Sequence, residues 1–435
     1  EYLEMIRRLH IRTYDYLGEM RASTNPLGYC EGGFYGGHLK PGEKNTLAVR
    51  LENLPESSRW YPGAGLYRNV HLIITEDAYI PVWGTYITTP SVNEKFAKVN
   101  VRTKVVLPEG ADPAKYSVET SVWNPNKQKL TAVRTSLAQM KYNNNQAEQE
   151  FVIQAPSLWS PEMPALYSAE TRLYEGDKLK DIYTTPFGIR SIEIIPDKGF
   201  FLNGKRTVFK GVCNHHDLGP LGAAVNDAAI RRQIRILKDM GCNAIRTSHN
   251  MPAPELIRAC DEMGMMIMAE SFDEWNVAKC KNGYNLLFDE WAEKDLVNLL
   301  HNFRNNPSVV MWCIGNEVPN QWNEGDCKIA KWLQDICHRE DPTRPVTQGM
   351  DAPDAVVNNN FAAVMDVAGF NYRPFKYKIN YKKLPQRIVL GSETASTVSS
   401  RGVYKFPVER KAMAKYDDHQ ASSYDVEHCG WSNLP

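Results

Sequence analysis

From about residue 187 onward, short apolar segments alternate with longer segments of helical spacing, and this alternation constrains the fold more than any other feature of the chain. Repeated strand–helix units place their strands parallel to one another in a single sheet. Seven such strands predict a TIM (β/α)8 barrel that lacks its last strand. The expected strands cover residues 208–212, 243–246, 265–269, 309–314, 345–347, 367–370 and 388–390.

The segments between these strands carry the start and stop signals of helices. A helix is expected over residues 227–240, and a second opens at Pro254 and closes at Gly264. A long helix ends before Pro307, and another covers residues 326–338. The apolar positions expected to be buried in this last helix are Ile329, Trp332, Leu333 and Ile336.

Two of the predicted strands end in the same way, with an apolar run followed by Gly-x-Glu. The first run leads through Gly315 and Asn316 to Glu317, and the other leads through Gly391 to Glu393. In α/β barrels, active sites lie at the carboxyl ends of the strands. We therefore expect the two carboxylates at one rim of the sheet. A pair of carboxylates that flank one bond is the arrangement that glycoside hydrolysis needs.

The first part of the chain is typical of β-structure. Residues 1–78 contain strand-like segments on either side of an aromatic and glycine-rich loop over 59–67, which is either a rigid turn or a surface that stacks on a sugar. Residues 79–186 contain short alternating strands separated by turn signals, and these predict an immunoglobulin-like β-sandwich. A chain of 435 residues is too long for one hydrophobic core, so two or three domains are expected. The third domain is the barrel over 187–435.

The charge balance restricts the partners of the protein. The 51 Lys and Arg residues equal the 51 Asp and Glu residues in number, which argues against nucleic acid or an anionic membrane surface as the main partner. No apolar run approaches the ~18 residues of a membrane-spanning helix. No signal peptide is visible, and because the chain begins with Glu1 we expect the natural start to lie upstream.

The nine cysteines are scattered and odd in number, which indicates buried free thiols and not a disulfide framework. No Cys-x-x-Cys pair occurs, so a structural zinc site is not expected. Few disulfides do not exclude an oxidising compartment. The compartment therefore stays open, with a bacterial cytoplasm or periplasm as the expectation.

Five motifs, in this order, resemble glycoside hydrolase family 2, which includes β-galactosidases, β-glucuronidases and β-mannosidases. The resemblance covers about residues 40–435, and the loop over 60–67 is similar to the end of the family's N-terminal sugar-binding domain. Residues 1–78 would then be part of a β jelly-roll domain. The motifs lie at residues 211–215, 245–250, 304–309, 312–317 and 391–393.

The resemblance identifies Glu317 as the acid/base and Glu393 as the nucleophile of a retaining exo-β-glycosidase, in agreement with the strand count. In such an enzyme the two carboxyl groups lie ~5–5.5 Å apart, and the nucleophile forms a covalent glycosyl-enzyme intermediate. The pKa of Glu317 must then lie near the working pH, raised by burial and by the charge of Glu393. A β-galactosidase is preferred on family frequency. The alternatives are a β-glucuronidase and a non-catalytic carbohydrate-binding protein.

The resemblance also implies a set of residues around the sugar. Asn316 matches the residue that bonds the sugar 2-hydroxyl, and Tyr372 matches the tyrosine that bonds the nucleophile. Other positions depart from the better-known pattern, among them Asn214 and the residues after the nucleophile, so the identity of the sugar stays open. The remaining residues expected to bind substrate are His215, Arg246, His249, Asp217 and Trp60.

No cofactor is expected to be required. Glu270 and Asp273, after the third strand, could bind a divalent cation, but salt bridges to rim arginines are the preferred interpretation, and no metal ligands can be assigned. The expected partner is an oligosaccharide or glycoside substrate, with no nucleic acid and no membrane, and a homo-oligomer is left open. Residues 1–78 hold too few strands for a whole jelly roll, and no eighth strand follows Trp431. We therefore expect an incomplete chain that aggregates or is inactive as written.

Overall fold

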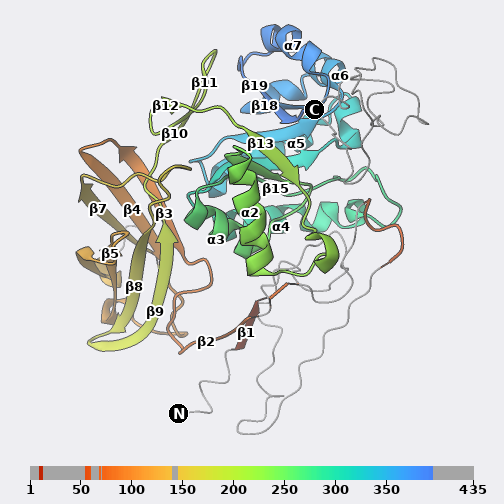
Figure 1. Cartoon of the computed structure of the whole chain (residues 1–435). Helices are drawn as coiled ribbons and strands as arrows, with labels where there is room; N and C mark the ends of the chain where they lie inside the picture. The colour runs from red at the N-terminus through yellow and green to blue at the C-terminus, as the bar shows by residue number, and fades with distance from the viewer. Residues whose placement is uncertain (1–8, 13–53, 60–67, 70, 140–145, 395–435) are drawn as a thin grey trace.

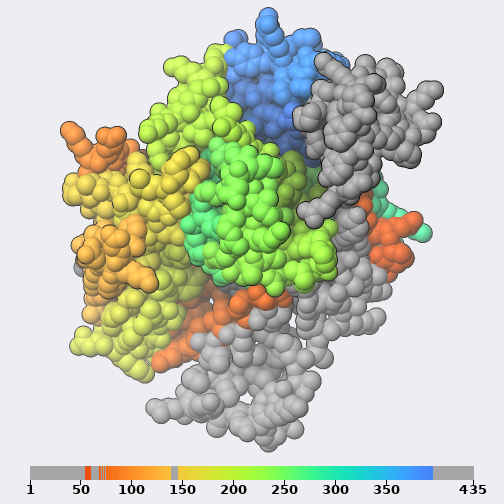
Figure 2. Space-filling model, in the orientation of Figure 1, coloured from red at the N-terminus to blue at the C-terminus, as the bar shows by residue number. Residues whose placement is uncertain are grey.

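The computed structural model describes residues 9–12, 54–59, 68–69, 71–139 and 146–394. Within them, a β-sandwich lies beside a curled parallel sheet that carries helices on its outer face (Figure 1). The two units abut in the space-filling view (Figure 2). A short antiparallel pair consists of β1 (Leu9–Arg12) and β2 (His71–Ile74). The loop over 60–67, with Trp60, lies outside the described residues, and the jelly-roll domain stays a prediction.

The sandwich consists of a three-stranded and a four-stranded antiparallel sheet. Alternate residues of each strand point into the space between the sheets, and on β4 these are Ala97, Val99 and Val101, all fully buried. This burial explains the period-two pattern of the sequence. The immunoglobulin-like topology stays a prediction. The strands are β3 (Thr85–Val92), β4 (Phe96–Lys104) and β7 (Gln146–Gln154) in one sheet, and β6 (Lys129–Ser136), β5 (Tyr116–Trp123), β8 (Tyr167–Glu175) and β9 (Lys178–Phe187) in the other.

The seven strands predicted from residue 208 onward are present, parallel and in chain order in one seven-stranded sheet. All seven extend past their predicted carboxyl ends, because polar end residues such as Asn371 and Glu393 still pair across the sheet. The predicted start of the first strand is wrong, since Val208 lies outside it and is 57% exposed. The strands are β13 (Gly211–Asn214), β14 (Ala244–Thr247), β15 (Met266–Glu270), β16 (Val309–Asn316), β17 (Val346–Met350), β18 (Val367–Asn371) and β19 (Val389–Glu393).

The helices pack their apolar faces on the outside of the parallel sheet. Gly264 ends α3 in the left-handed conformation, as its position in the sequence predicts. The prediction that Trp332 is buried is wrong: it is 38% exposed, and its ring meets Phe288 edge-on. The helices are α2 (Asp227–Asp239), α3 (Pro254–Met263), α4 (Phe288–Phe303), α5 (Cys327–Glu340), α6 (Pro353–Asn358) and α7 (Tyr377–Lys383). None of the described helices is long and apolar enough to span a bilayer.

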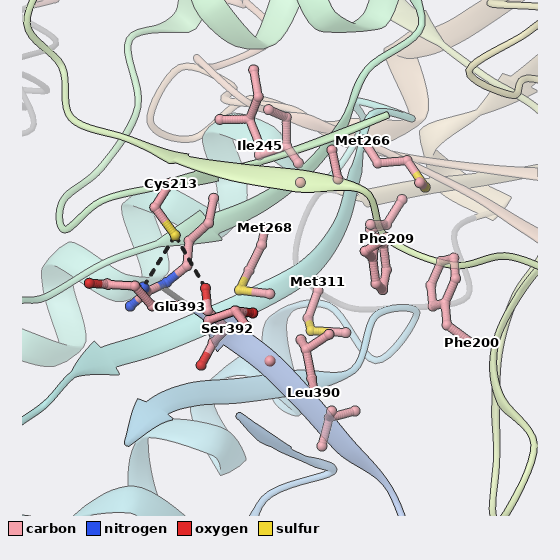
Figure 3. A pocket seen from close by; sticks show the side chains of 18 of the residues that line it. Phe200, Phe209, Cys213, Ile245, Met266, Met268, Met311, Leu390, Ser392 and Glu393 are labelled. Carbon is pink, nitrogen blue, oxygen red and sulfur yellow. Dashed lines mark hydrogen bonds and ion pairs between the residues drawn. The ribbon is translucent and has the colours of Figure 1, made fainter. Parts of the chain in front are cut away.

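A cavity of about 1000 Å³ occupies the inside of the curled sheet. Figure 3 shows Phe200 and Phe209 at one end, Glu393 at the other, and the sulfur atoms of Met268 and Met311 between them. Side-chain layers fill the inside of a closed eight-stranded barrel. The expectation of a missing eighth strand is not tested, because residues 395–435 lie outside the described part of the chain. Phe200 belongs to a small antiparallel sheet formed by β10 (Ile192–Ile195), β11 (Gly199–Leu202) and β12 (Lys205–Arg206).

The motif over 304–309 attaches the sandwich to the sheet of α/β units. The side chain of Asn305 accepts a hydrogen bond from Ile87 N at 2.8 Å and donates one to Thr85 O at 2.9 Å, so it pairs with β3 as a neighbouring strand would. From the end of the sandwich, buried Arg190 donates to the carbonyl oxygens of Pro307 and Val309 at 2.7 and 2.8 Å. These contacts pair backbone groups of β3 and of the motif across the junction.

The cysteines of the described residues are all free thiols, as their spacing in the sequence predicts. Cys260 and Cys337 are buried among apolar side chains, and burial raises the pKa of both thiols. A thiol in such surroundings behaves as a small apolar side chain. These cysteines are therefore part of the packing.

Candidate active site at the carboxyl ends of the parallel strands

The carboxyl ends of five parallel strands bring together one layer of polar side chains with a guanidinium at its centre. Buried Arg246 donates from Nε to Glu270 Oε2 at 2.5 Å, from Nη1 to Glu393 Oε2 at 2.9 Å and from Nη2 to Asn316 Oδ1 at 2.8 Å. Asn371 Nδ2 donates to Asn316 Oδ1 at 3.0 Å. A buried guanidinium needs such partners, and its planar fork holds all of them in one orientation.

Gly349 on β17 makes room for this layer. A Cβ atom at Gly349 would lie 2.6 Å from Arg246 Nη2, 3.0 Å from Asn371 Oδ1 and 3.2 Å from Asn316 Oδ1. The first of these distances is shorter than any ordinary contact. Glycine on the fifth strand therefore allows the side chains of β14, β16 and β18 to meet inside the sheet.

Glu393 is held through both of its carboxylate oxygens. The hydroxyl of Tyr372 donates to Oε1, and Arg246 Nη1 donates to Oε2. His249 Nε2 lies 3.6 Å from the same Oε2. The side chain remains 17% exposed, so a ligand can reach it. Sequence reasoning placed Tyr372, Arg246 and His249 in this pocket, and the structure gathers all three around Glu393.

Glu317 lies in a drier environment at the end of β16. Burial, and after it the charge of Asp351, raises the pKa of Glu317 to about 7, and the charge of Glu393 acts in the same direction. A hydrogen bond from Asn371 Nδ2 to Glu317 Oε1, at 2.9 Å, opposes the shift. A carboxyl group with such a pKa is half protonated near neutral pH, as the sequence-based interpretation of Glu317 requires.

The backbone is strained directly after β16 and directly after β18. Glu317 and Tyr372 adopt φ values of 43° and 56°, in the left-handed region that residues other than glycine rarely occupy. Each such residue costs roughly 1–3 kcal/mol, and strained residues of this kind cluster at active sites. The surrounding bonds hold the two in place, since Glu317 N donates to Gly349 O at 2.7 Å and Tyr372 N donates to Glu393 O at 2.6 Å.

Asp273 supports the other side of the polar layer. Arg59 bonds it through two nitrogen atoms at 2.9 and 2.8 Å, Lys279 Nζ lies at 2.8 Å, and Asn316 Nδ2 donates to it at 3.0 Å. Burial alone would raise the pKa of Asp273, but its bonds to Arg59 and Lys279 lower it. The salt bridges preferred for Glu270 and Asp273 are thus present. In the part of the chain that the structure describes, no cluster of three or more metal-ligating side chains occurs.

The other residues predicted to bind substrate are His215, Asp217 and Trp60. His215 stacks edge-on against His249 with ring centroids 5.2 Å apart, and both line the cavity. The carboxylate of Asp217 accepts a hydrogen bond from Gly219 N at 2.5 Å within a surface turn, and its expected contact with substrate stays a prediction. Trp60 lies outside the described residues.

Sequence reasoning missed three members of the site. Asn371 ends a strand directly before Tyr372, just as Asn316 precedes Glu317, and this pattern could have identified it. Asp351 and Lys279 carried no comparable signal, because each is an ordinary charged residue in a loop. Only the folded structure brings the charges of Asp351 and Lys279 close to Glu317.

Two family models match the chain. Residues 193–425 match the TIM barrel domain of glycosyl hydrolases family 2, and residues 79–190 match a second model, described as glycosyl hydrolases family 2. Among curated proteins, "Beta-galactosidase BoGH2A" of Bacteroides ovatus is 36% identical, with 96% of this chain and 54% of that protein covered. A "Putative beta-glucuronidase" of Formosa agariphila is 33% identical, with 88% of this chain and 35% of that protein covered.

Solved structures agree with these matches. A glycosyl hydrolase family 2 member from Bacteroides cellulosilyticus has a TM-score of 0.78 at 32% identity, covering 89% of this chain and 51% of that one. A β-glycosidase from Bacteroides vulgatus has a TM-score of 0.71 at 34% identity, covering 80% of this chain and 42% of that one. The chain thus spans about half the length of these relatives or less. The family model of the barrel domain covers more than half of the chain, and the chain belongs to glycoside hydrolase family 2.

Proposed function

We propose that this chain carries the catalytic centre of a retaining β-glycosidase, with Glu393 as the nucleophile and Glu317 as the acid/base. The observation that supports it best is the contrast between two carboxylates joined to one polar layer. Glu393 faces the Arg246 cation and the Tyr372 hydroxyl, whereas burial raises the pKa of Glu317 to about 7. In glycosidases, the carboxyl group with the raised pKa acts as the acid, and the carboxylate in polar surroundings acts as the nucleophile.

In the proposed reaction, Glu393 attacks the anomeric carbon while Glu317 protonates the oxygen of the leaving group. Glu317 then removes a proton from the water that hydrolyses the glycosyl-enzyme intermediate. Asn316 is the residue that would bond the sugar 2-hydroxyl in this proposal. Its Oδ1 accepts from Arg246 and Asn371, and one of the two Nδ2 hydrogens is donated to Asp273, which leaves the other for the substrate.

Two variants test these roles. Glu317→Ala should lose most activity toward substrates with poor leaving groups. Azide should restore turnover of substrates with good leaving groups, because it attacks the anomeric carbon of the glycosyl-enzyme in place of water, releases Glu393 and needs no general base. Glu393→Gln should be inactive with or without azide. A Glu393→Gln protein with normal turnover, or a folded Glu317→Ala protein that azide never rescues, would refute the assignment.

The finer proposal is an exo-acting enzyme that removes terminal β-linked galactose from an oligosaccharide or glycoside. It rests on the similarity to the Bacteroides ovatus protein named a β-galactosidase. The second candidate is a β-glucuronidase, favoured by relatives of that name in Formosa agariphila and Bacteroides fragilis. A panel of nitrophenyl β-galactoside, β-glucuronide, β-mannoside and β-glucoside separates these candidates. No turnover of any of them, with tight binding of a sugar, would favour the non-catalytic alternative.

The proposal includes the domain division expected from the sequence. The sugar-binding domain lies in residues 1–78, the immunoglobulin-like sandwich in 79–186 and the catalytic unit in 187–435. Arg59 supports a role of the first segment in the site, because its guanidinium bonds Asp273 beside Asn316. A homo-oligomer stays open.

A further inference from the structure

Glu270, at the end of β15, is the most deeply buried carboxylate behind the proposed nucleophile, with no exposed surface. Both of its oxygens are occupied. Oε2 accepts from Arg246 Nε at 2.5 Å and from Cys313 Sγ at 2.9 Å, and Oε1 lies 2.7 Å from His249 Nδ1. Its backbone N lies 3.0 Å from Thr247 Oγ1. The side chain is thus fixed by partners from both neighbouring strands, Arg246 and His249 at the end of β14 and Cys313 within β16.

The two main partners of Glu270 are also the partners of Glu393. Arg246 uses Nε for Glu270 and Nη1 for Glu393 Oε2, at 2.9 Å, so one guanidinium bridges the two carboxylates. His249 uses its two ring nitrogens in the same way, with Nδ1 on Glu270 and Nε2 3.6 Å from Glu393 Oε2. Glu270 therefore bonds two residues that lie against the nucleophile, one of which, Arg246, donates to it directly.

The charges of this cluster determine the protonation of His249. Burial raises the pKa of Glu270 and the adjacent Arg246 opposes that shift, while the donors Arg246 Nε and Cys313 Sγ both point at Oε2 and make that oxygen an acceptor. Burial, and after it Arg246, lowers the pKa of His249 well below its ordinary value, so the ring is neutral. A neutral ring carries one N–H, and a carboxylate partner draws it to Nδ1. The other nitrogen, Nε2, is then an acceptor 3.6 Å from Glu393 Oε2, so it cannot donate to that carboxylate and can accept from a substrate hydroxyl.

We propose that Glu270 is a positioning residue that fixes the guanidinium of Arg246 and the ring tautomer of His249 around Glu393. This inference rests on the proposed function of Glu393. A Gln side chain at position 270 could still accept one hydrogen bond, but its NH2 group would oppose a donor of Arg246 or His249. The nucleophile would then lose the fixed orientation of both partners, although no group that contacts substrate had been removed.

Asp261 offers a matched control, because it is a buried carboxylate of the same barrel that contacts no residue of the site. It accepts hydrogen bonds from Ser308 N at 2.9 Å and from Asn306 Nδ2 at 2.5 Å. Replacement of Asp261 by Asn removes a buried charge from packing alone. A general effect of a lost buried carboxylate is thus separable from an effect on the nucleophile.

The test compares Glu270→Gln with Asp261→Asn in the enzyme. Glu270→Gln should lower kcat by about 100-fold with KM within a few-fold, as losses of orienting carboxylates do, and should change the acid limb of the pH–rate profile. That profile reflects the groups facing Glu270, which are Arg246, His249 and Cys313, with Glu393 beyond them. Asp261→Asn should lower the melting temperature and leave the pH profile unchanged. Equal effects of both variants on kcat and pH profile would overturn the proposal.

A second readout does not depend on activity. In 15N NMR of the wild-type protein, His249 should show a protonated Nδ1 and an unprotonated Nε2 between about pH 6 and 8, with the signal assigned by its loss in His249→Gln. A protonated Nε2 would overturn the role of Glu270 whatever Glu393 does. If instead the tautomer is as expected but Glu393→Gln remains active, the proposed function fails and the arrangement of Glu270 stands.

Discussion

At the scale of single residues, one residue type takes three roles at the carboxyl ends of the strands. Glu317 is partly buried beside an amide and has a raised pKa, Glu393 faces a cation and a phenol, and Glu270 lies wholly inside the polar layer. The Gly-x-Glu pattern was enough to find the first two from the sequence. Glu270 lacks that pattern, since its role comes from hydrogen bonds to Arg246 and His249 that only the fold creates.

The pH dependence of the first catalytic step should follow Glu317. A pKa of about 7 means that the protonated acid is lost as the pH rises through neutrality, so kcat should fall on the alkaline side of about pH 7. Asp351 is the second cause of the raised pKa, after burial, so Asp351→Asn should move this limb to lower pH. Asp354→Asn, an exposed aspartate paired with Lys376, is the control and should leave the limb in place. An unmoved limb in Asp351→Asn would contradict this account.

The close approach at Gly349 predicts a large effect from one methyl group. In Gly349→Ala the new Cβ would lie 2.6 Å from Arg246 Nη2, so the guanidinium must shift. A misplacement of about 1 Å near the chemistry costs roughly 100-fold in rate. Gly211→Ala on β13 is the control, because its Cβ would meet Ala244 O at 3.3 Å and the neighbour need move little. Equal activity of the two variants would show that the layer tolerates movement.

At the scale of elements, the sequence predicted the existence and order of the parallel strands better than their ends. Apolar runs marked the strands, but polar residues such as Asn371 and Glu393 belong to them as well and look like loop residues in a sequence. The short helices α6 and α7 were not predicted, because six or seven residues show too little periodicity. Trp332 was assigned to the core because helical spacing gives the inward face but not where the neighbouring helix ends.

Helix α4 carries a buried acid that should make stability depend on pH. Asp295 is fully buried, accepts from the Tyr284 hydroxyl at 2.6 Å on Oδ2, and has no partner for Oδ1 among the described residues. Burial raises the pKa of Asp295 to about 8. Its folded pKa exceeds the unfolded value, so the stability it contributes is present at low pH and is lost as the pH rises toward 8.

Asp295→Asn should remove this dependence. Urea unfolding at pH 5 and pH 8 should show that the wild type loses a few kcal/mol relative to the variant between the two values. The neutral amide keeps an acceptor for Tyr284 and gains a donor. Parallel loss of stability in both proteins would mean that Asp295 is ionised in the folded state.

At the scale of the whole molecule, the motif over 304–309 has a structural explanation. Asn305 completes the edge of β3, while Arg304 lies over the ring of Tyr86, 4.5 Å from its centroid. The position of this motif directly before β16 gave no indication that Asn305 contacts a strand some 220 residues earlier. Contacts of this range, such as that between Arg59 and Asp273, are what sequence reasoning could not supply.

The junction predicts that Asn305 contributes to the coupled unfolding of the sandwich and the parallel sheet. Asn305→Ala removes two hydrogen bonds and leaves the backbone groups of β3 unpaired, which should cost about 2 kcal/mol at the interface. Calorimetry should then resolve two transitions or a lower single one. Asn302→Ala, which removes one bond to Trp83, should have a smaller effect. Unchanged unfolding of Asn305→Ala would show that Arg190 and the apolar contacts suffice.

The central claim is that Glu393 forms a covalent bond to the sugar. Its most direct test is mass spectrometry of peptides after incubation with a 2-deoxy-2-fluoro glycosyl fluoride of the sugar that the nitrophenyl panel selects. The account predicts one added fluorosugar, on the peptide that contains Glu393, and its absence in Glu393→Gln. A label on Glu317 or Glu270, or an active enzyme that is never labelled, would contradict it.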